Sequence, residues 1–161
     1  MRGMPFTERL RALPFLGGSA FASVGRRVFP VADVSVQRLT RGRLSLAGTF
    51  GMPLLLLTTV GRRSGQPRVT ALTYARDGDG IIVVGSNWGQ TRQPDWALNL
   101  RATPDAEIEQ HGRRTRVTAR LLEGAERAAA WKLLLRVWPH YSTYELRAGE
   151  RELLVFRLTE R

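Results

Sequence analysis

Two adjacent arginines stand in the stretch TTVGRRSGQPRVT, residues 58–70, between two segments whose composition is typical of β-strands. Gly61 and Gly65 let the main chain approach a ligand closely, and a turn of this kind presents several backbone N–H groups on one side. The pattern predicts either an anion-binding loop or a solvated basic turn, because guanidinium groups match the paired oxygens of phosphate and carboxylate. The side-chain donors of the stretch are Arg62, Arg63, Ser64, Gln66 and Arg68.

Small residues follow the next apolar run, in VVGSNWGQ at residues 83–90. Gly85, Ser86 and Asn87 lie where a strand is expected to end, a place where loops carry exposed backbone donors and often bind ligands. A plain connection between a strand and a helix explains the same residues. This segment is therefore a second candidate for contact with a ligand.

Three aromatic residues recur at intervals of three in WPHYSTY, residues 138–144. If this tract is helical, Trp138, Tyr141 and Tyr144 share one face. Their amphipathic rings suit the wall of a pocket for a planar molecule, with a hydroxyl available on one side. An aromatic stripe of this spacing is also typical of a helix that packs in the core, so both interpretations stand.

Other catalytic groups are missing from the sequence. The chain has no cysteine, which excludes disulfides, thiolate chemistry and zinc–thiolate sites. Its two histidines, His111 and His140, lack metal-ligand spacing, and neither a Ser/His/Asp set nor a spaced pair of carboxylates is evident. We expect no metal site. An enzyme built on this chain would take its difficult chemistry from a bound cofactor.

The charge balance indicates anionic partners. Lysine and arginine number 25 against 14 aspartates and glutamates, a net charge of +11, and all but Lys132 of the basic residues are arginine. Nucleic acid, an anionic membrane surface and a phosphorylated or carboxylated small molecule would each be attracted, although genome composition explains part of the excess. Aromatic residues do not alternate with the basic run as stacking platforms would, so we expect no nucleic-acid partner.

The elements that would position these residues begin at Pro53. Three β-rich runs, LLLLTT, RVTALTYA and GIIVVGS, are separated by turn residues and predict three consecutive antiparallel strands. PDWALNLRA predicts a helix, and AEIEQH with RRTRVTARLLE a second hairpin. GAERAAAWKLLLRVW predicts a longer helix that ends at Pro139, and ELLVFRL the last strand. Six strands without βαβ alternation favour an α+β fold, a small antiparallel barrel with helices outside it.

Residues 1–50 differ from the rest and are interpreted as an N-terminal arm before one globular domain at 51–161. They are basic and weakly apolar, include a predicted short helix, and suit an arm that covers the core or contacts a membrane surface. Residues 20–22 resemble a signal-peptide cleavage site, but charged, proline and glycine residues interrupt the apolar region. We therefore expect a cytoplasmic protein, with peripheral contact at the inner face of the membrane and a homodimer as further options.

Five segments carry a more specific signal. They are LLLLTTVGRRSGQPRVTALTY, IIVVGSNWGQ, PDWALNLRATP, VTARLLEGAERAAAW and WPHYSTYELRAGERELLVFRLT, within residues 54–159. In order and spacing they resemble the deazaflavin (F420)-dependent nitroreductases, split-barrel flavin and deazaflavin oxidoreductases best known from actinobacteria. The resemblance implies a split antiparallel barrel of the FMN-binding type.

The resemblance also implies a cofactor and a reaction. The cofactor would be coenzyme F420, an 8-hydroxy-5-deazaflavin with a phosphate and oligoglutamate tail, and FMN is the less favoured alternative. The reaction would transfer a hydride from the reduced coenzyme to a planar electrophile such as a quinone, nitroaromatic or enone. A deazaflavin-binding carrier without an acceptor of its own is the alternative function.

Roles for individual residues follow from the resemblance. Contacts to the tail and its phosphate are implied for Arg62, Arg63, Ser64, Gly65, Gln66, Arg68 and Val69. Contacts to the ring and its side chain are implied for Gly85, Ser86 and Asn87, with Trp96 and Asn99 in the family's PxWxxNL segment. The substrate wall would consist of Trp138, Tyr141 and Tyr144. Tyr141 is the first choice of proton donor and Ser86 the second, because each hydroxyl could hydrogen-bond the oxygen that gains negative charge.

Three positions depart from the family's pattern. Gln93 replaces a common histidine, Trp88 a common glycine, and Trp138 the tyrosine of some nitro-reducing members. These changes leave cofactor binding intact, but they leave the choice of substrate open.

Overall fold

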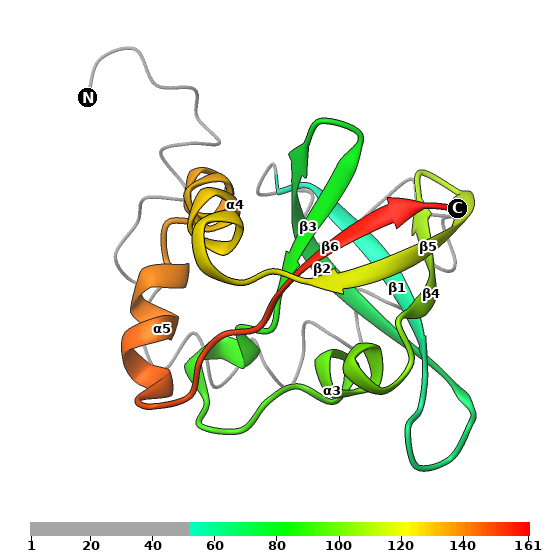
Figure 1. The fold of residues 1–161 in the computed structure, drawn as a ribbon, viewed down its shortest axis with the longest axis horizontal. Coiled ribbons are helices and arrows are strands. Elements are labelled where there is room, and N and C mark those ends of the chain that lie inside the picture. Colours follow the sequence, from blue (N-terminus) through cyan, green and yellow to red (C-terminus); the bar gives the residue numbers. More distant parts are fainter. Residues whose placement is uncertain (1–51) are drawn as a thin grey trace.

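The computed structural model describes residues 52–161, so the predicted N-terminal arm and its short helix lie outside the described residues. Six strands form one closed antiparallel barrel in the order β1-β2-β3-β6-β5-β4 (Figure 1). The predicted antiparallel barrel is confirmed. Its strands are β1 (Leu54–Val60), β2 (Pro67–Asp77), β3 (Gly80–Val84), β4 (Asp105–Gln110), β5 (Arg113–Leu121) and β6 (Val155–Glu160).

The helices of the described chain lie outside the barrel. In Figure 1, α4 and α5 lie along one side of it, and α3 lies near the end at which β1 turns into β2. None of the helices within residues 52–161 combines the length and the apolar character needed to cross a membrane. The helical elements are the 3-10 turn η3 (Asn87–Gly89), α3 (Asp95–Ala102), α4 (Gly124–Val137) and α5 (Tyr141–Ala148).

The apolar run of β3 is continuous because both of its faces are buried. Ile81 and Val83 belong to a core cluster that includes side chains of all six strands and therefore fills the barrel. Ile82 and Val84 belong to a second cluster, shared with α4 and α5, on the outside of the barrel wall. Successive strand residues point to opposite faces, so a strand between two clusters needs apolar residues at every position. Trp96 of α3 joins the interior cluster.

Tight turns close the two hairpins at the end of the barrel opposite α3. Gln110 pairs with Arg113, which leaves a two-residue turn of His111 and Gly112 with φ of 51° and 79°. Positive φ at both positions matches the twist of the flanking strands. The turn between β2 and β3, at residues 78–79, lies at the same end.

Two differences between the predicted elements and the structure have a clear physical cause. The last strand begins at Val155 rather than residue 152, because its partner strand β3 ends at Val84, which pairs with Val155. The chain is extended at Trp138 (φ −140°, ψ 93°), since a residue before proline avoids the helical region. A new helix starts at Tyr141, so the prediction of one helical face is wrong for Trp138.

Candidate functional site

The residues predicted to contact the cofactor gather mainly at one end of the barrel, here called the loop end (Figure 1). It consists of the β1–β2 loop (residues 61–66), the connection from β3 to α3 (residues 85–94), and α3. Because neighbouring strands are antiparallel, the end of β1 and the end of β3 meet here. The opposite end, here called the open end, carries the turns at residues 78–79 and 111–112.

The β1–β2 loop is closed by its own backbone. Gly61 donates its N–H to the Gln66 carbonyl at 2.8 Å. The Gly61 carbonyl in turn accepts the N–H groups of Ser64 at 3.1 Å and Gly65 at 2.7 Å. A Cβ at Gly61 would lie 2.8 Å from the Ser64 hydroxyl, and Gly65 has a φ of +66°, so both positions favour glycine. These N–H groups, expected to face a ligand, are therefore used within the loop.

Arg62 ties this loop to α3. Its backbone N–H and its Nη1 both donate to Asn99 Oδ1 at 3.1 Å, and its Nη2 pairs with Asp95 Oδ1 at 3.0 Å. Asn99 is 3% exposed and donates from Nδ2 to Thr59 Oγ1 at 3.1 Å. The hydrogen bond from Arg62 holds the pKa of Asp95 below its ordinary value, and Arg92 adds to the effect. The i,i+4 spacing of Asp95 and Asn99 is the sequence signal for this contact.

Two further arginines, Arg63 in the loop and Arg68 at the start of β2, are exposed. Arg63 and Arg68 have no carboxylate partner within residues 52–161, although Arg68 Nη2 approaches Ser64 Oγ at 3.4 Å. Gly65 is also exposed, and Val69 is half-buried next to Arg68 on β2. Charged donors without a protein acceptor fit the oxygens of a phosphate or carboxylate.

Arg151 organises the connection from β3 to α3 (residues 85–94), here called the second loop. No local sequence pattern marks Arg151 for this role. Its guanidinium group donates to the backbone carbonyls of Gly85 at 2.8 Å, Ser86 at 2.7 Å and Gln90 at 2.6 Å. It also donates to Gln93 Oε1 at 3.0 Å. These acceptors precede Arg151 by 58 to 66 residues in the sequence. The connection after β3 is therefore fixed by a residue close to the C-terminus.

Between these contacts the backbone takes an unusual course. Asn87 and Trp88 have φ of 44° and 56°, in the left-handed region that residues other than glycine seldom adopt. Asn87 Nδ2 donates to the Arg92 carbonyl at 2.8 Å. A Cβ on Gly89 would lie 2.9 Å from the Tyr144 carbonyl oxygen, so only glycine permits this close approach to α5.

The aromatic residues predicted to form a substrate wall meet this loop. The Trp88 and Tyr144 rings have centroids 6.0 Å apart, and the Tyr144 and Tyr141 rings lie edge-to-face at 6.2 Å. Trp138 is buried in the same cluster. Burial raises the pKa of both tyrosines, so both phenols keep their protons at neutral pH. The Tyr144 hydroxyl is buried and has no acceptor within residues 52–161.

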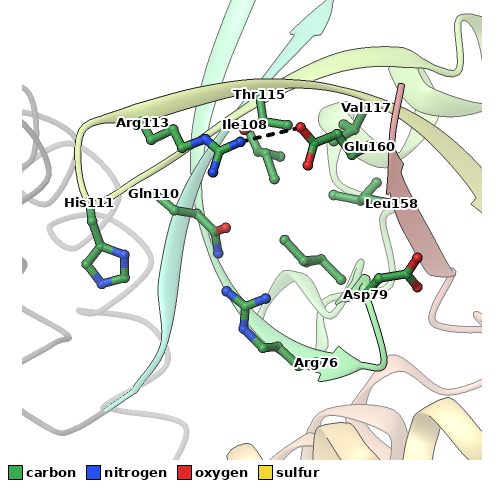
Figure 2. Close-up of a pocket in the computed structure, with 11 residues that line it drawn as sticks. Arg76, Asp79, Ile108, Gln110, His111, Arg113, Thr115, Val117, Leu158 and Glu160 are labelled. Carbon is green, nitrogen blue, oxygen red and sulfur yellow. Dashed lines mark ion pairs between the residues drawn. The ribbon is translucent and has the colours of Figure 1, made fainter.

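A cavity of about 340 Å³ lies at the open end, away from every predicted site residue (Figure 2). Figure 2 shows Gln110 and Arg76 directed inward and an ion pair of 3.5 Å between Arg113 and Glu160. Residues 52–161 contain no cluster of His, Asp or Glu able to hold a metal ion, here or elsewhere. The lining residues are Arg76, Asp79, Ile81, Ile108, Gln110, His111, Arg113, Thr115, Val117, Leu158 and Glu160.

Comparison with known proteins identifies the family. The model of the F420H2-dependent quinone reductase family matches residues 32–160. The chain belongs to this family. A relative, the F420H2-dependent quinone reductase Rv1261c of Mycobacterium tuberculosis, is 38% identical over 141 residues, which are 86% of this chain and 93% of the relative.

Solved structures agree with this family assignment. An F420H2-dependent reductase, FDR-A, is similar with a TM-score of 0.61 and 32% identity, over 66% of this chain and 93% of that one. A chain described as a domain-swapped dimer is similar with a TM-score of 0.63 and 28% identity, over 80% of this chain and 96% of that one.

As a member of the F420H2-dependent quinone reductase family, this chain is an F420H2-dependent oxidoreductase whose cofactor is coenzyme F420. The family resemblance, the enzyme class and the cofactor expected from the sequence are confirmed. The loop end also fits the coenzyme chemically. Arg63 and Arg68 offer charged donors for an anionic tail, and the Tyr144 hydroxyl is a buried donor beside the second loop.

Proposed function

We propose that this protein reduces quinones with F420H2 and holds the coenzyme at the loop end of the barrel. When bound, the coenzyme supplies the hydride. One observation carries the proposal: Arg62 is paired with Asp95, whereas Arg63 and Arg68 are exposed and have no carboxylate partner in residues 52–161. Two available guanidinium groups, one on the β1–β2 loop and one at the start of β2, suit a tail of phosphate and carboxylates.

The rigidity of the loop supports this assignment. Asn99 holds the loop backbone, and Trp96, which is 6% exposed, packs against Phe156 with ring centroids 6.0 Å apart. A loop that is already ordered loses little conformational entropy when it binds a ligand. Trp96 and Asn99 would then serve the coenzyme by positioning the loop. The proposed tail contacts beside the arginines are Ser64, Gly65, Gln66 and Val69.

The ring of the coenzyme is proposed to lie against Gly85, Ser86 and Asn87, with the acceptor beside the aromatic wall. The buried rings of Trp138, Tyr141 and Tyr144 suit a planar, electron-poor molecule. Nitroaromatics and enones share these properties with quinones and are proposed as further acceptors.

Tyr141 is proposed as the proton donor, with Ser86 as the second candidate. Burial raises the pKa of Tyr141, the nearby Tyr144 adds to the rise and a hydrogen bond with Thr73 opposes it. The phenol is therefore neutral at working pH and can donate a hydrogen bond to an acceptor oxygen that gains negative charge. In a Tyr141→Phe variant we expect kcat to fall on the order of 100-fold with F420 affinity nearly unchanged. An unchanged kcat, with Ser86→Ala impaired instead, would move the role to Ser86.

The anionic-tail contact is tested by fluorescence titration with F420 of defined glutamate number. Replacing Arg63 or Arg68 by alanine should remove about 1.5 to 3 kcal/mol of binding free energy, roughly a 10- to 150-fold loss of affinity. The loss should grow with the number of glutamates, and kcat at saturating coenzyme should change little. Arg136→Ala is the matched control, because Arg136 is exposed on α4 away from both loops. Parent-like affinity in the Arg63/Arg68 double variant would overturn the assignment.

We further propose a cytoplasmic enzyme whose residues 1–50 contact the inner face of the membrane. The support is composition, because a basic segment with apolar residues is attracted to anionic lipid. Sedimentation with vesicles of anionic and of neutral lipid tests this contact, and equal recovery with both would reject it. A homodimer is proposed by analogy with the domain-swapped neighbour, and light scattering in solution would reveal it.

A further inference from the structure

The guanidinium group of Arg151 spans one loop of the candidate site. Its acceptors are three backbone carbonyls and one side-chain amide, at 2.6 to 3.0 Å. Donors that point in several fixed directions are a property of the planar arginine fork, and a lysine ammonium cannot reach all of these acceptors from one position. Arg151 therefore fixes the positions of the acceptors relative to one another.

Arg151 is a half-buried cation that is surrounded by neutral acceptors. The residue is half-buried, and within residues 52–161 it has no carboxylate partner. Removing a cation from water is costly, and burial accordingly lowers the pKa of Arg151. Carbonyl oxygens offset this cost only when they point at the guanidinium and accept its hydrogen bonds. The cation thus holds the backbone itself, which a surface ion pair would not do.

The backbone between the anchored carbonyls is strained. The carbonyls of Ser86 and Gln90 are held by Arg151, and Asn87 and Trp88 between them both have positive φ. Such conformations persist where the surroundings over-determine them, and they concentrate at functional sites. The same short segment brings the Trp88 ring to Tyr144.

We propose that Arg151 is a positioning residue of the coenzyme site, acting on the connection from β3 to α3. By holding the carbonyls of Gly85 and Ser86, it sets where the Ser86 hydroxyl and the Asn87–Trp88 turn stand relative to Tyr144. This inference rests on the proposed function, which puts the coenzyme ring against the same loop. Arg151 acts through the loop, so its loss should disturb the ring and the hydride transfer, whereas tail binding at Arg63 and Arg68 should be spared.

Arg151→Lys is the test variant and Arg157→Lys is its matched control. Arg157 is also half-buried, and it donates from Nη2 to the Asp77 carbonyl at 2.9 Å and pairs with Asp77 Oδ2 at 3.2 Å. Its contacts lie at the open end, beside the turn between β2 and β3. The two variants make the same chemical change on the same part of the chain, so a general loss of stability should affect both.

Three measurements separate positioning from a merely structural role. Hydrogen exchange of the coenzyme-free protein should be about tenfold faster at residues 86–90 in Arg151→Lys than in the control. The kcat with saturating F420H2 should fall on the order of 10- to 100-fold, because a small displacement of the reacting groups is enough. Affinity should fall by the same factor for F420 and for the deazaflavin without its tail, unlike the loss in the Arg63 variants.

Each outcome decides a separate claim. Exchange at residues 86–90 equal to that of the control, or unchanged kcat and affinity despite faster exchange, would overturn the role of Arg151. A parent protein that does not bind F420 would overturn the proposed function, while the exchange result would still report on the loop. If Arg151→Lys does not fold, Gln93→Ala removes one acceptor and leaves Arg151 in place. It should give a smaller increase in exchange at residues 86–90, and no increase would count against the proposal.

Discussion

The two ends of the barrel hold their polar side chains in different ways. At the loop end, Arg62 and Arg151 donate to groups that lie 33 to 66 residues away in the sequence. At the open end, Arg157 makes one half-buried contact of this kind, with Asp77, but the other pairs there are local or exposed. Arg114 donates to Glu109, five residues away across a hairpin. The ion pair of Arg113 with Glu160 joins side chains that are 78% and 64% exposed.

This difference has consequences for function. Exposed ion pairs contribute about 0 to 1 kcal/mol, whereas removal of one partner of a buried hydrogen bond costs about 1 to 3 kcal/mol. The loop end is therefore preorganised, and the exposed ion pairs of the open end can rearrange at little cost. The cavity of about 340 Å³ lies at the open end, so it and the buried and half-buried polar contacts of Arg62, Asn99 and Arg151 are at opposite ends of the barrel.

Asn99→Ala, at the loop end, should cause the largest loss of stability, and Arg113→Ala, at the open end, is its comparison. The substitution leaves Thr59 and the backbone N–H of Arg62 without their buried partner. We expect the free energy of unfolding to fall by about 2 to 4 kcal/mol, as measured by urea denaturation. Arg113→Ala, which breaks an exposed pair at the open end, should cost less than about 1 kcal/mol. If both variants lose similar, small amounts of unfolding free energy, the two ends do not differ in how firmly they hold their polar groups.

Trp88→Gly should produce a smaller effect that appears in specificity. Glycine adopts the φ of 56° without strain, which offsets the lost ring contact with Tyr144, so stability should change by about 1 kcal/mol or less. The KM for a small quinone should rise on the order of tenfold, while F420 affinity stays within about threefold. His111→Gly is the control, because His111 has a φ of 51° in a turn at the open end. An unchanged KM in the Trp88 variant would remove this residue from the acceptor site.

Asp95→Asn should produce the smallest effect, in the response to acid. The hydrogen bond from Arg62 holds the pKa of Asp95 below its ordinary value of 3.8. A lowered folded pKa gives stability that is present above the ordinary value and is lost as the pH falls through the folded value. Because the Asp95 side chain is 62% exposed, this contribution should be below about 1 kcal/mol. Urea midpoints measured from pH 5 to about pH 3 should fall more steeply in the parent than in Asp95→Asn. Parallel profiles would show that the ion pair between Arg62 and Asp95 does not stabilise the loop.

The fold could be predicted because its signals are local. Glycine-rich turns separate the β-rich runs, and Pro139 ends a helix with apolar residues at helical spacing. The same proline also explains the extended backbone at Trp138, a consequence that could have been read from the sequence. The start of β6 depends instead on where its partner β3 ends, and pairing of distant strands is not encoded locally.

The residues of the candidate site could be selected from the sequence, but the contacts that hold them could not. The donor-rich loop and the Gly85–Asn87 segment stand out by residue type, and the barrel brings both to one end. The division between the paired Arg62 and the exposed Arg63 depends on α3, which follows more than 30 residues later. The contacts of Arg151 could not be predicted from the sequence either, because its acceptors lie on a distant loop and no spacing rule connects them to Arg151.

The coenzyme is proposed to bind at the loop end, and hydrogen exchange with and without F420 tests this most directly. We predict that F420 slows exchange at residues 61–68 and 85–90 and leaves the hairpin end at residues 110–115 unchanged. The deazaflavin without its tail should protect residues 85–90 alone. Protection confined to residues 110–115, beside the cavity, would contradict the claim and place the coenzyme at the open end.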